Sequence, residues 1–329
     1  MTQEGSCDMK TCLSVWTLLK PNYAPPYCDV ISTAADCGFD AVDLPICYAD
    51  ALDDYWTDEM IRKTRALAAD RGVAIAQVCM FQNLIGGLGS CDPARVEDAL
   101  GMLRRGCALA RGLGAQMLNI ISPSPDDISV LTTATLPEYY YLNIPDMIVP
   151  GTQIRNVDGW RFDAKFRMNI AKEFDWQKHW DMFVSAMRRA SAIAAEFSLN
   201  LTLENRNNTM TPHTDSTTRL LRHVGASNLG ATFNVSQAFL HREILEWAAH
   251  KYGKNVLHVR ACDADGLACY NLPIGEGIID WSDLIDGLSE VGYDGYISLE
   301  WLNDAQAFEH VQESLAYLKK RMIRSGVAC

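Results

Sequence analysis

Several features that would assign this chain to a familiar class are missing from its sequence. No run of apolar residues approaches the roughly 18–20 that a membrane-spanning helix needs. The first residues, MTQEGSCDMK, lack the basic region and apolar run of a secretory signal. Basic residues are in the minority, because 29 Lys and Arg face 41 Asp and Glu and leave a net charge of −12. We therefore expect neither a membrane nor a nucleic acid as the main partner.

The sequence also lacks an organised cysteine pattern. The 11 cysteines form no C-x-x-C pair, their number is odd and their spacings are scattered. This argues against a disulfide framework or a zinc cluster. Most of them, such as Cys37, Cys79 and Cys107, stand in apolar periodic segments, where cysteine behaves as a small buried hydrophobe. The pattern is typical of a reduced, cytoplasmic protein.

Strand-like and helix-like segments alternate eight times along the chain. The expected strands cover 11–16, 41–44, 73–80, 115–121, 199–204, 231–235, 256–260 and 295–300. The expected helices cover 27–37, 57–70, 92–111, a stretch from about 175, a stretch from about 215, 238–252, a stretch from 280, and 304–324. Such alternation indicates parallel βαβ units, and eight of them favour a closed (β/α)8 TIM barrel, as a single domain over 1–329. The first loops lack the G-x-G-x-x-G phosphate-binding fingerprint, which argues against a dinucleotide-binding sheet.

One long insertion interrupts this alternation. Residues 122–175 separate the fourth strand from the next helix, and they include the aromatic run Tyr139, Tyr140 and Tyr141. A loop of this length in a compact domain is usually functional or disordered, and its aromatic content favours order. It also follows the C-terminal end of a strand, where barrel enzymes place their sites. We predict a lid or substrate wall in which Tyr140 contacts the substrate; an oligomer contact is the alternative.

Four strand-like runs in the second half of the chain end in polar residues. LTLEN (201–205), ATFNV (231–235), VLHVR (256–260) and YISLE (296–300) carry Glu204, Asn234, Arg260 and Glu300. Side chains alternate along a strand, so these four should face the barrel interior while the intervening apolar residues face the helices. Charges inside a barrel are costly unless they are paired or functional. The pattern predicts a functional site at the barrel mouth; a buried ion-pair network that only orders the barrel is the alternative.

At these residues the sequence resembles the sugar isomerase/epimerase superfamily of xylose-isomerase-like barrels. The resemblance rests on GFDAVDL (38–44), RGVAIAQV (71–78), LTLENR (201–206), HVRACDADG (258–266), LPIGEGIIDW (272–281) and GYDGYISLEW (292–301). It implies a small sugar-like substrate, a possible homo-oligomer, and a divalent cation (Mn, Mg or Co) held by Glu, Asp, His and Glu at the ends of strands five to eight. Those ligand positions correspond to Glu204, Asn234, Arg260 and Glu300, and a further family histidine corresponds to Gln237.

Only the two glutamates match this implied ligand set. A guanidinium offers only donors and cannot bind a cation, and an asparagine brings no charge. Asparagine in place of Asp removes one negative charge, and arginine in place of His adds one positive charge. Together the two changes supply about the two positive charges that a divalent cation would have provided. We therefore expect no metal or other cofactor, with Arg260 bridging Glu204 and Glu300. The alternative is a shift of the strand that makes His258 a ligand of a divalent cation together with Glu204, Asn234 and Glu300.

The reaction expected at such a site is proton abstraction at carbon, that is, isomerisation, epimerisation or elimination of a sugar-like or hydroxy-carbonyl small molecule. Arg260 would stabilise an oxyanion, and carboxylates paired tightly with it would have lowered pKa values and weak basicity. His258 is therefore a further acid/base candidate beside Glu204 and Glu300. The expected substrate contacts are Arg206, Asn234, Gln237, Trp16, Trp301, Tyr140 and Asp263. Two alternatives remain: a metal-dependent sugar isomerase or epimerase, and a catalytically inactive barrel that acts as a binding subunit.

Overall fold

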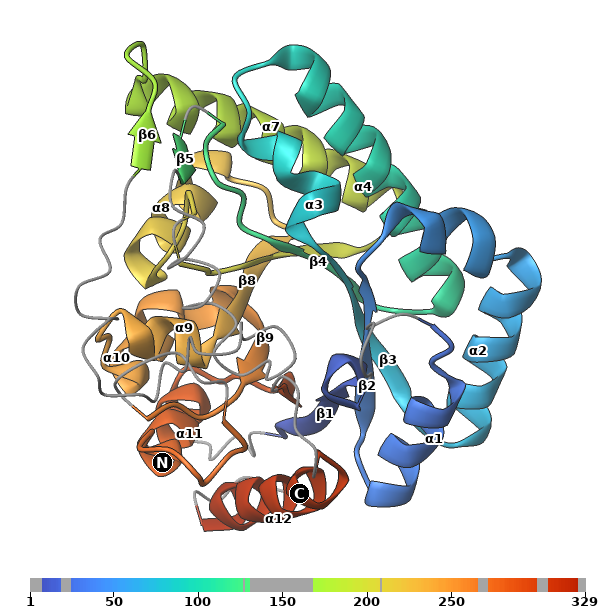
Figure 1. Cartoon of the computed structure of the whole chain (residues 1–329). Helices are drawn as coiled ribbons and strands as arrows, with labels where there is room; N and C mark the ends of the chain where they lie inside the picture. The colour runs from blue at the N-terminus through green and yellow to red at the C-terminus, as the bar shows by residue number, and fades with distance from the viewer. Residues whose placement is uncertain are drawn as a thin grey trace, which may run out of the picture.

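The computed structural model describes residues 8–18, 25–126, 128–130, 168–207, 209–265, 272–300 and 307–324. Within these ranges, eight parallel strands close into a barrel in the order β1-β10-β9-β8-β7-β4-β3-β2 (Figure 1). They are β1 (Lys10–Ser14), β2 (Ala41–Ile46), β3 (Ala74–Met80), β4 (Met117–Ile121), β7 (Asn200–Glu204), β8 (Leu229–Asn234), β9 (Val256–Ala261) and β10 (Tyr296–Leu299). The predicted (β/α)8 barrel is confirmed.

Helices surround the barrel on its outside (Figure 1). The longer ones are α1 (Cys28–Cys37), α2 (Asp58–Asp70), α4 (Pro93–Leu113), α7 (Trp176–Glu196), α8 (Thr214–Val224), α10 (Leu245–Tyr252), α11 (Trp281–Glu290) and α12 (Ala307–Arg324). The shorter ones are η1 (Val15–Leu18), η2 (Ala51–Tyr55), α3 (Gln82–Ile85), η3 (Gly86–Gly89), α9 (Val235–Leu240) and η5 (Gly253–Asn255). No helix in the described ranges is long and apolar enough to cross a membrane.

The apolar core lies between the strands and these helices. Leu201, Phe233, Val259 and Ile297 come from alternate strand positions and are buried in one large apolar cluster with helix residues. Because side chains alternate across a strand, the residues next to them point into the barrel. The polar side chains at the alternate positions of these strands therefore face the barrel interior, as expected.

Capping residues explain where several helices begin and end. Thr57 accepts a hydrogen bond from the amide of Met60 and starts α2, and Asp280 accepts from the amides of Ser282 and Asp283 and starts α11. Gly38 ends α1 with φ of 84°, a left-handed conformation that glycine adopts without strain. These boundaries agree with the sequence prediction.

Three predicted boundaries differ from the structure. The first strand ends at Ser14, so Trp16 lies in the 3-10 turn η1 rather than in a strand. The helix expected over 238–252 is divided into α9 and α10, and Arg242 between them has φ of 61°, which no helix accommodates. The strand expected over 231–235 covers Leu229–Asn234, because Val235 already begins α9. The helix expected near 215 begins at Thr214, as predicted, and His213 caps it by accepting from the amide of Ser216.

The described parts of the insertion form a small separate sheet. After β4, strand β5 (Ile128–Val130) pairs antiparallel with β6 (Met168–Ile170), which leads to α7. Residues 131–167, and with them the predicted lid and Tyr140, lie outside the described residues, as does Trp301.

Candidate functional site

The barrel topology brings the four polar strand ends to one mouth. Glu204 and Asn234 are the last residues of β7 and β8, Arg260 is near the end of β9, and Glu300 directly follows β10. These strands are neighbours in the closed barrel, and Asn234 pairs in register with Arg260. Three of the four residues, all except Asn234, line a small pocket, whose full lining is Ser14, Trp16, Pro45, Cys79, Phe81, Ile121, Glu204, Arg206, Arg260 and Glu300.

Arg260 lies between the two glutamates. Its Nε atom is 3.2 Å from Glu204 Oε2, and its Nη1 atom donates to Glu300 Oε2. Its Nη2 atom donates to Cys79 Sγ at 3.0 Å. Burial alone would lower the pKa of Arg260, but the surrounding acidic groups, Glu300 foremost, raise it well above its ordinary value. The guanidinium is therefore a permanent buried cation held by two carboxylates.

Glu204 is fixed by donors on several sides. Asn119 donates to its Oε2 atom at 3.1 Å, and Asn234 donates to its Oε1 atom at 2.8 Å. Its side chain is only 3% exposed. With Arg260 on the same carboxylate, Glu204 has little freedom to approach a substrate.

Asn234 presents its amide nitrogen, and not its oxygen, to Glu204. Its Oδ1 atom accepts from the amide of Gln237 and the hydroxyl of Ser236, both at 3.2 Å, and so caps α9. The cap fixes the orientation of the amide, because a backbone N–H can only donate. The group that faces the site is therefore the Nδ2 donor.

These residues do not fit a divalent cation at the strand ends. A cation needs oxygen, nitrogen or sulfur lone pairs, whereas Asn234 directs an N–H group toward Glu204 and the Arg260 guanidinium, which offers donors only, lies between the two glutamates. The alternative ligand His258 lies two residues before Arg260 on β9, and its Nε2 atom is 2.9 Å from Asp43 Oδ2. Within the described part of the chain, His258 forms no ligand cluster with the two glutamates.

Glu300 is the more accessible of the two carboxylates. Its side chain is 15% exposed, and its Oε2 atom accepts from Ser14 Oγ at 2.9 Å as well as from Arg260. Burial raises the pKa of Glu300, and this effect exceeds the lowering by Arg260. The expectation that pairing with Arg260 lowers the pKa of this carboxylate is therefore wrong, because the sequence pattern does not reveal the desolvation of the group.

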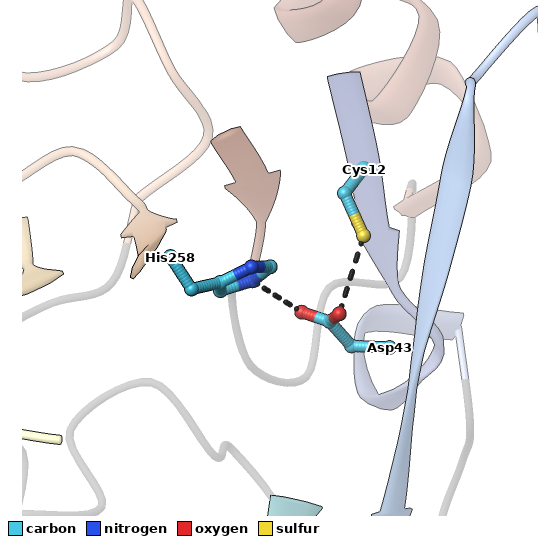
Figure 2. A group of neighbouring side chains, drawn as sticks. All are labelled: Cys12, Asp43 and His258. Atoms are coloured by element: carbon cyan, nitrogen blue, oxygen red, sulfur yellow. Dashed lines mark hydrogen bonds and ion pairs between the residues drawn. The ribbon is translucent and has the colours of Figure 1, made fainter. Parts of the chain in front are cut away.

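A second polar layer fills the barrel interior below the mouth. Asp43 accepts from Ser298 Oγ at 2.6 Å and from Gln77 Nε2 at 3.2 Å. The same oxygen accepts from His258 Nε2 at 2.9 Å, and Cys12 Sγ donates to the other oxygen at 3.3 Å (Figure 2). All five side chains belong to fully buried residues. Burial alone would raise the pKa of Asp43, but the imidazole of His258 leads the groups that lower it to about 2.

We expect the contribution of Asp43 to stability to disappear in acid. Its folded-state pKa of about 2 lies below its usual 3.8, so its ionised form stabilises the fold above about pH 4, and this stabilisation is lost as the pH falls toward 2. The pKa difference corresponds to about 2 kcal/mol. The unfolding free energies of the metal-free wild type and of metal-free Asp43→Asn, measured with urea, should therefore converge by that amount between pH 5 and 2. A difference that stays constant over this range contradicts the assignment.

Three other predicted contact residues, Arg206, Trp16 and Gln237, lie at different positions around the site. Arg206 reaches the pocket, with Nη1 at 3.9 Å from Glu204 Oε1. Trp16 stacks on Phe81 with ring centroids 4.6 Å apart and forms one wall of the pocket. Gln237 accepts from the amide of Asn207 at 3.2 Å and so braces the loop after β7.

Asp263 is not placed at the pocket, contrary to the expectation of a substrate contact. Its carboxylate accepts from the amides of Ala264, Gly275 and Ile279 and from the indole of Trp281. It is buried and ties the loop after β9 to the start of α11. An acidic residue that follows a strand matches the pattern of a site residue, but the backbone amides of a sharply folded loop require the same side chain.

Four residues near the site were not predicted from the sequence: Ser14, Asp43, Cys79 and Asn119. They belong to β1 to β4, which were predicted as strands from their apolar residues alone. The available signal was a polar residue at an inward position, for example Asp43 inside AVDL (41–44). The same alternation that singled out the second half of the chain would have found them.

A closed (β/α)8 barrel with charged side chains gathered at the C-terminal strand ends is the architecture of barrel enzymes. Comparison with known proteins identifies the family. The chain belongs to the xylose isomerase-like TIM barrel family, which matches residues 31–321.

Solved structures with the same fold include several sugar epimerases. D-psicose 3-epimerase from Clostridium cellulolyticum H10, solved with D-tagatose, superposes with a TM-score of 0.71 at 15% identity, covering 95% of this chain and 99% of that one. An L-ribulose 3-epimerase gives a TM-score of 0.72 at 15% identity, with coverage of 96% and 95%. The 3-keto-D-glucoside 4-epimerase from E. coli gives 0.67 at 15% identity, with coverage of 95% and 100%. At this identity the likeness establishes the shared fold.

A curated relative is similar over part of the chain. An uncharacterized protein of Methanocaldococcus jannaschii is 30% identical over 142 residues, which is 41% of this chain and 48% of that protein. The chain therefore spans about half the length of the curated relative that it matches.

Proposed function

We propose that the chain is an isomerase or epimerase that moves a proton at a carbon next to a carbonyl group of a sugar-like substrate, with Arg260 in place of a metal at the barrel mouth. The observation that carries the proposal is the position of the Arg260 guanidinium between Glu204 and Glu300. Removal of a proton next to a carbonyl produces an enediolate, whose negative oxygen needs a fixed positive charge or hydrogen-bond donors. A buried, permanently charged guanidinium supplies both.

The two glutamates have different roles in this proposal. Glu300 is the general base and acid, because it is more exposed and burial raises its pKa, which makes the ionised form a stronger base. Glu204 holds Arg260 in position, since Asn119 and Asn234 already occupy its oxygens. Ser14 donates to Glu300 and orients the carboxylate toward the pocket.

Arg260 keeps one donor that a substrate oxygen can capture. Its Nη2 atom donates to Cys79 Sγ, and a thiol sulfur is a weak acceptor. A developing oxyanion accepts far more strongly, so it replaces the sulfur contact without disturbing the ion pairs to the glutamates.

The remaining pocket lining favours a polyhydroxy substrate. The stacked pair of Trp16 and Phe81 offers an apolar face for the C–H groups of a sugar, while Arg206 supplies a second, partly exposed cation. The proteins of the same fold support the same class, because they include epimerases of ketoses and of a keto-glucoside.

Solvent deuterium exchange tests the proposal. We expect chelator-treated protein, incubated in D2O with a panel of ketoses and keto-glycosides, to place deuterium at the carbon next to the carbonyl of at least one substrate. Exchange that disappears with chelator and returns with Mn²⁺ would contradict the metal-free site. Absence of exchange and binding across the panel would contradict a catalytic role, and tight binding without exchange would support the inactive binding barrel.

A further inference from the structure

We propose that the chain holds a transition-metal ion in the barrel interior, bound by Cys12, Asp43 and His258, one layer below the mouth. This site is separate from the strand-end position discussed above, and it does not depend on the proposed reaction. The ion class is Zn²⁺ or a similar borderline cation, because the ligands are a thiolate, a carboxylate and an imidazole.

Three strands aim these ligands at one point. Cys12 comes from β1, Asp43 from β2 and His258 from β9, and Figure 2 shows their side chains converging. Cys12 Sγ is 3.3 Å from Asp43 Oδ1, and His258 Nε2 is 2.9 Å from Asp43 Oδ2. All three ligand atoms lie within 4.8 Å of one another. The two contacts involve different oxygens of Asp43, so the carboxylate would have to turn one oxygen toward both partners to hold an ion at ordinary zinc bond lengths of about 2.0–2.3 Å.

Gln77 provides the fourth donor. Its Nε2 atom donates to Asp43, while its Oε1 atom is buried and has no hydrogen-bond partner among the described residues. Such an unsatisfied buried oxygen is rare and calls for an explanation. Reversal of the amide would bring Oε1 to the side that faces Asp43, which makes Gln77 the candidate for the fourth ligand, and Ser298 orients the Asp43 carboxylate through its 2.6 Å hydrogen bond.

Charge balance favours a divalent ion here. When the Asp43 carboxylate is ionised and binding releases the proton of the Cys12 thiol, the two ligands together carry the two negative charges that neutralise M²⁺. A fully buried site tolerates an ion only when the local charge is balanced in this way. The strand-end position differs, because there the Arg260 cation already lies between the two carboxylates.

Cobalt substitution tests the site, since Co²⁺ bound to a thiolate gives a charge-transfer absorption in the near ultraviolet that oxygen ligands do not give. The full-length protein is expressed in cobalt-supplemented medium, so that the ion enters while the chain folds. We expect about one ion per chain and the thiolate band, as for a closed structural site. Protein without retained cobalt, or with cobalt but no thiolate band, would overturn the proposal.

Cysteine variants assign the ligand. Cys12→Ser should abolish the band, whereas Cys107→Ser, which changes another fully buried cysteine in α4, should retain it. The double variant Glu204→Gln with Glu300→Gln should also retain the band, which separates the interior site from the mouth. A band that persists in Cys12→Ser contradicts the assignment; if that variant does not fold, Asp43→Asn, which keeps the shape of the side chain, answers the same question through the cobalt content.

Discussion

Replacement of Arg260 by Met should lower the free energy of unfolding by about 3–5 kcal/mol, the usual cost of removing one partner from a buried ion pair. Methionine preserves much of the volume but leaves Glu204 and Glu300 buried without their cation. Desolvated carboxylates without a partner are costly, so either the fold weakens or both groups take up protons. Denaturant unfolding at neutral pH measures the loss directly.

Two further variants separate the buried charge from a general effect of losing an arginine. Arg104→Met removes the partner of Glu196 in an exposed ion pair, and its effect should be small because solvent screens such pairs. A triple variant, in which Glu204→Gln and Glu300→Gln are added to Arg260→Met, no longer has the unpaired charges. It should recover most of the lost stability. A small effect of Arg260→Met alone contradicts the buried triad.

Glu300→Gln should reduce the rate of carbon-bound deuterium exchange by about 10²–10⁴-fold, the typical contribution of a positioned general base. Glutamine keeps the size and can still accept from Ser14, but it cannot take up a proton. The exchange rate of the wild type should rise with pH through the raised pKa of Glu300, because only the ionised form abstracts a proton.

Glu196→Gln serves as the matched control on the surface, and its exchange rate should equal that of the wild type. Circular dichroism and thermal unfolding of Glu300→Gln establish that the variant is folded. An exchange rate for Glu300→Gln close to that of the wild type assigns the base to another residue, and the division of roles between the two glutamates is then wrong.

Much of the architecture followed from the sequence because each signal was local and repeated. The alternation of strands and helices predicted the barrel, and caps such as Thr57 and Asp280 located helix starts. The inward-facing positions of Glu204, Arg260 and Glu300 followed from the period of two along a strand. The expected bridge by Arg260 agrees with the ion pairs in the structure.

The missed features depend on three-dimensional packing. The direction of the Glu300 pKa shift reflects how deeply the group is buried, which no local pattern records. Asp43 lies on a strand and Asp263 just after one, so the sequence presents them alike. In the structure Asp263 braces a loop, whereas Asp43 lies in the barrel interior. Their partners are distant in the sequence, so only the fold distinguishes them. The break between α9 and α10 likewise depends on the backbone conformation of one residue, Arg242.

If Arg260 and Asn234 stand at the mouth in place of a divalent cation, the native mouth should not bind Mn²⁺. The measurement compares two proteins, both carrying Cys12→Ser to exclude the interior ligands. One keeps the native mouth, and the other carries Asn234→Asp and Arg260→His, which restore the ligand types that the family resemblance implies. Calorimetric titration should show about one Mn²⁺ bound by the restored mouth and none bound through Glu204 and Glu300 in the native one. Mn²⁺ bound by the native mouth, and lost on Glu204→Gln or Glu300→Gln, would contradict the account.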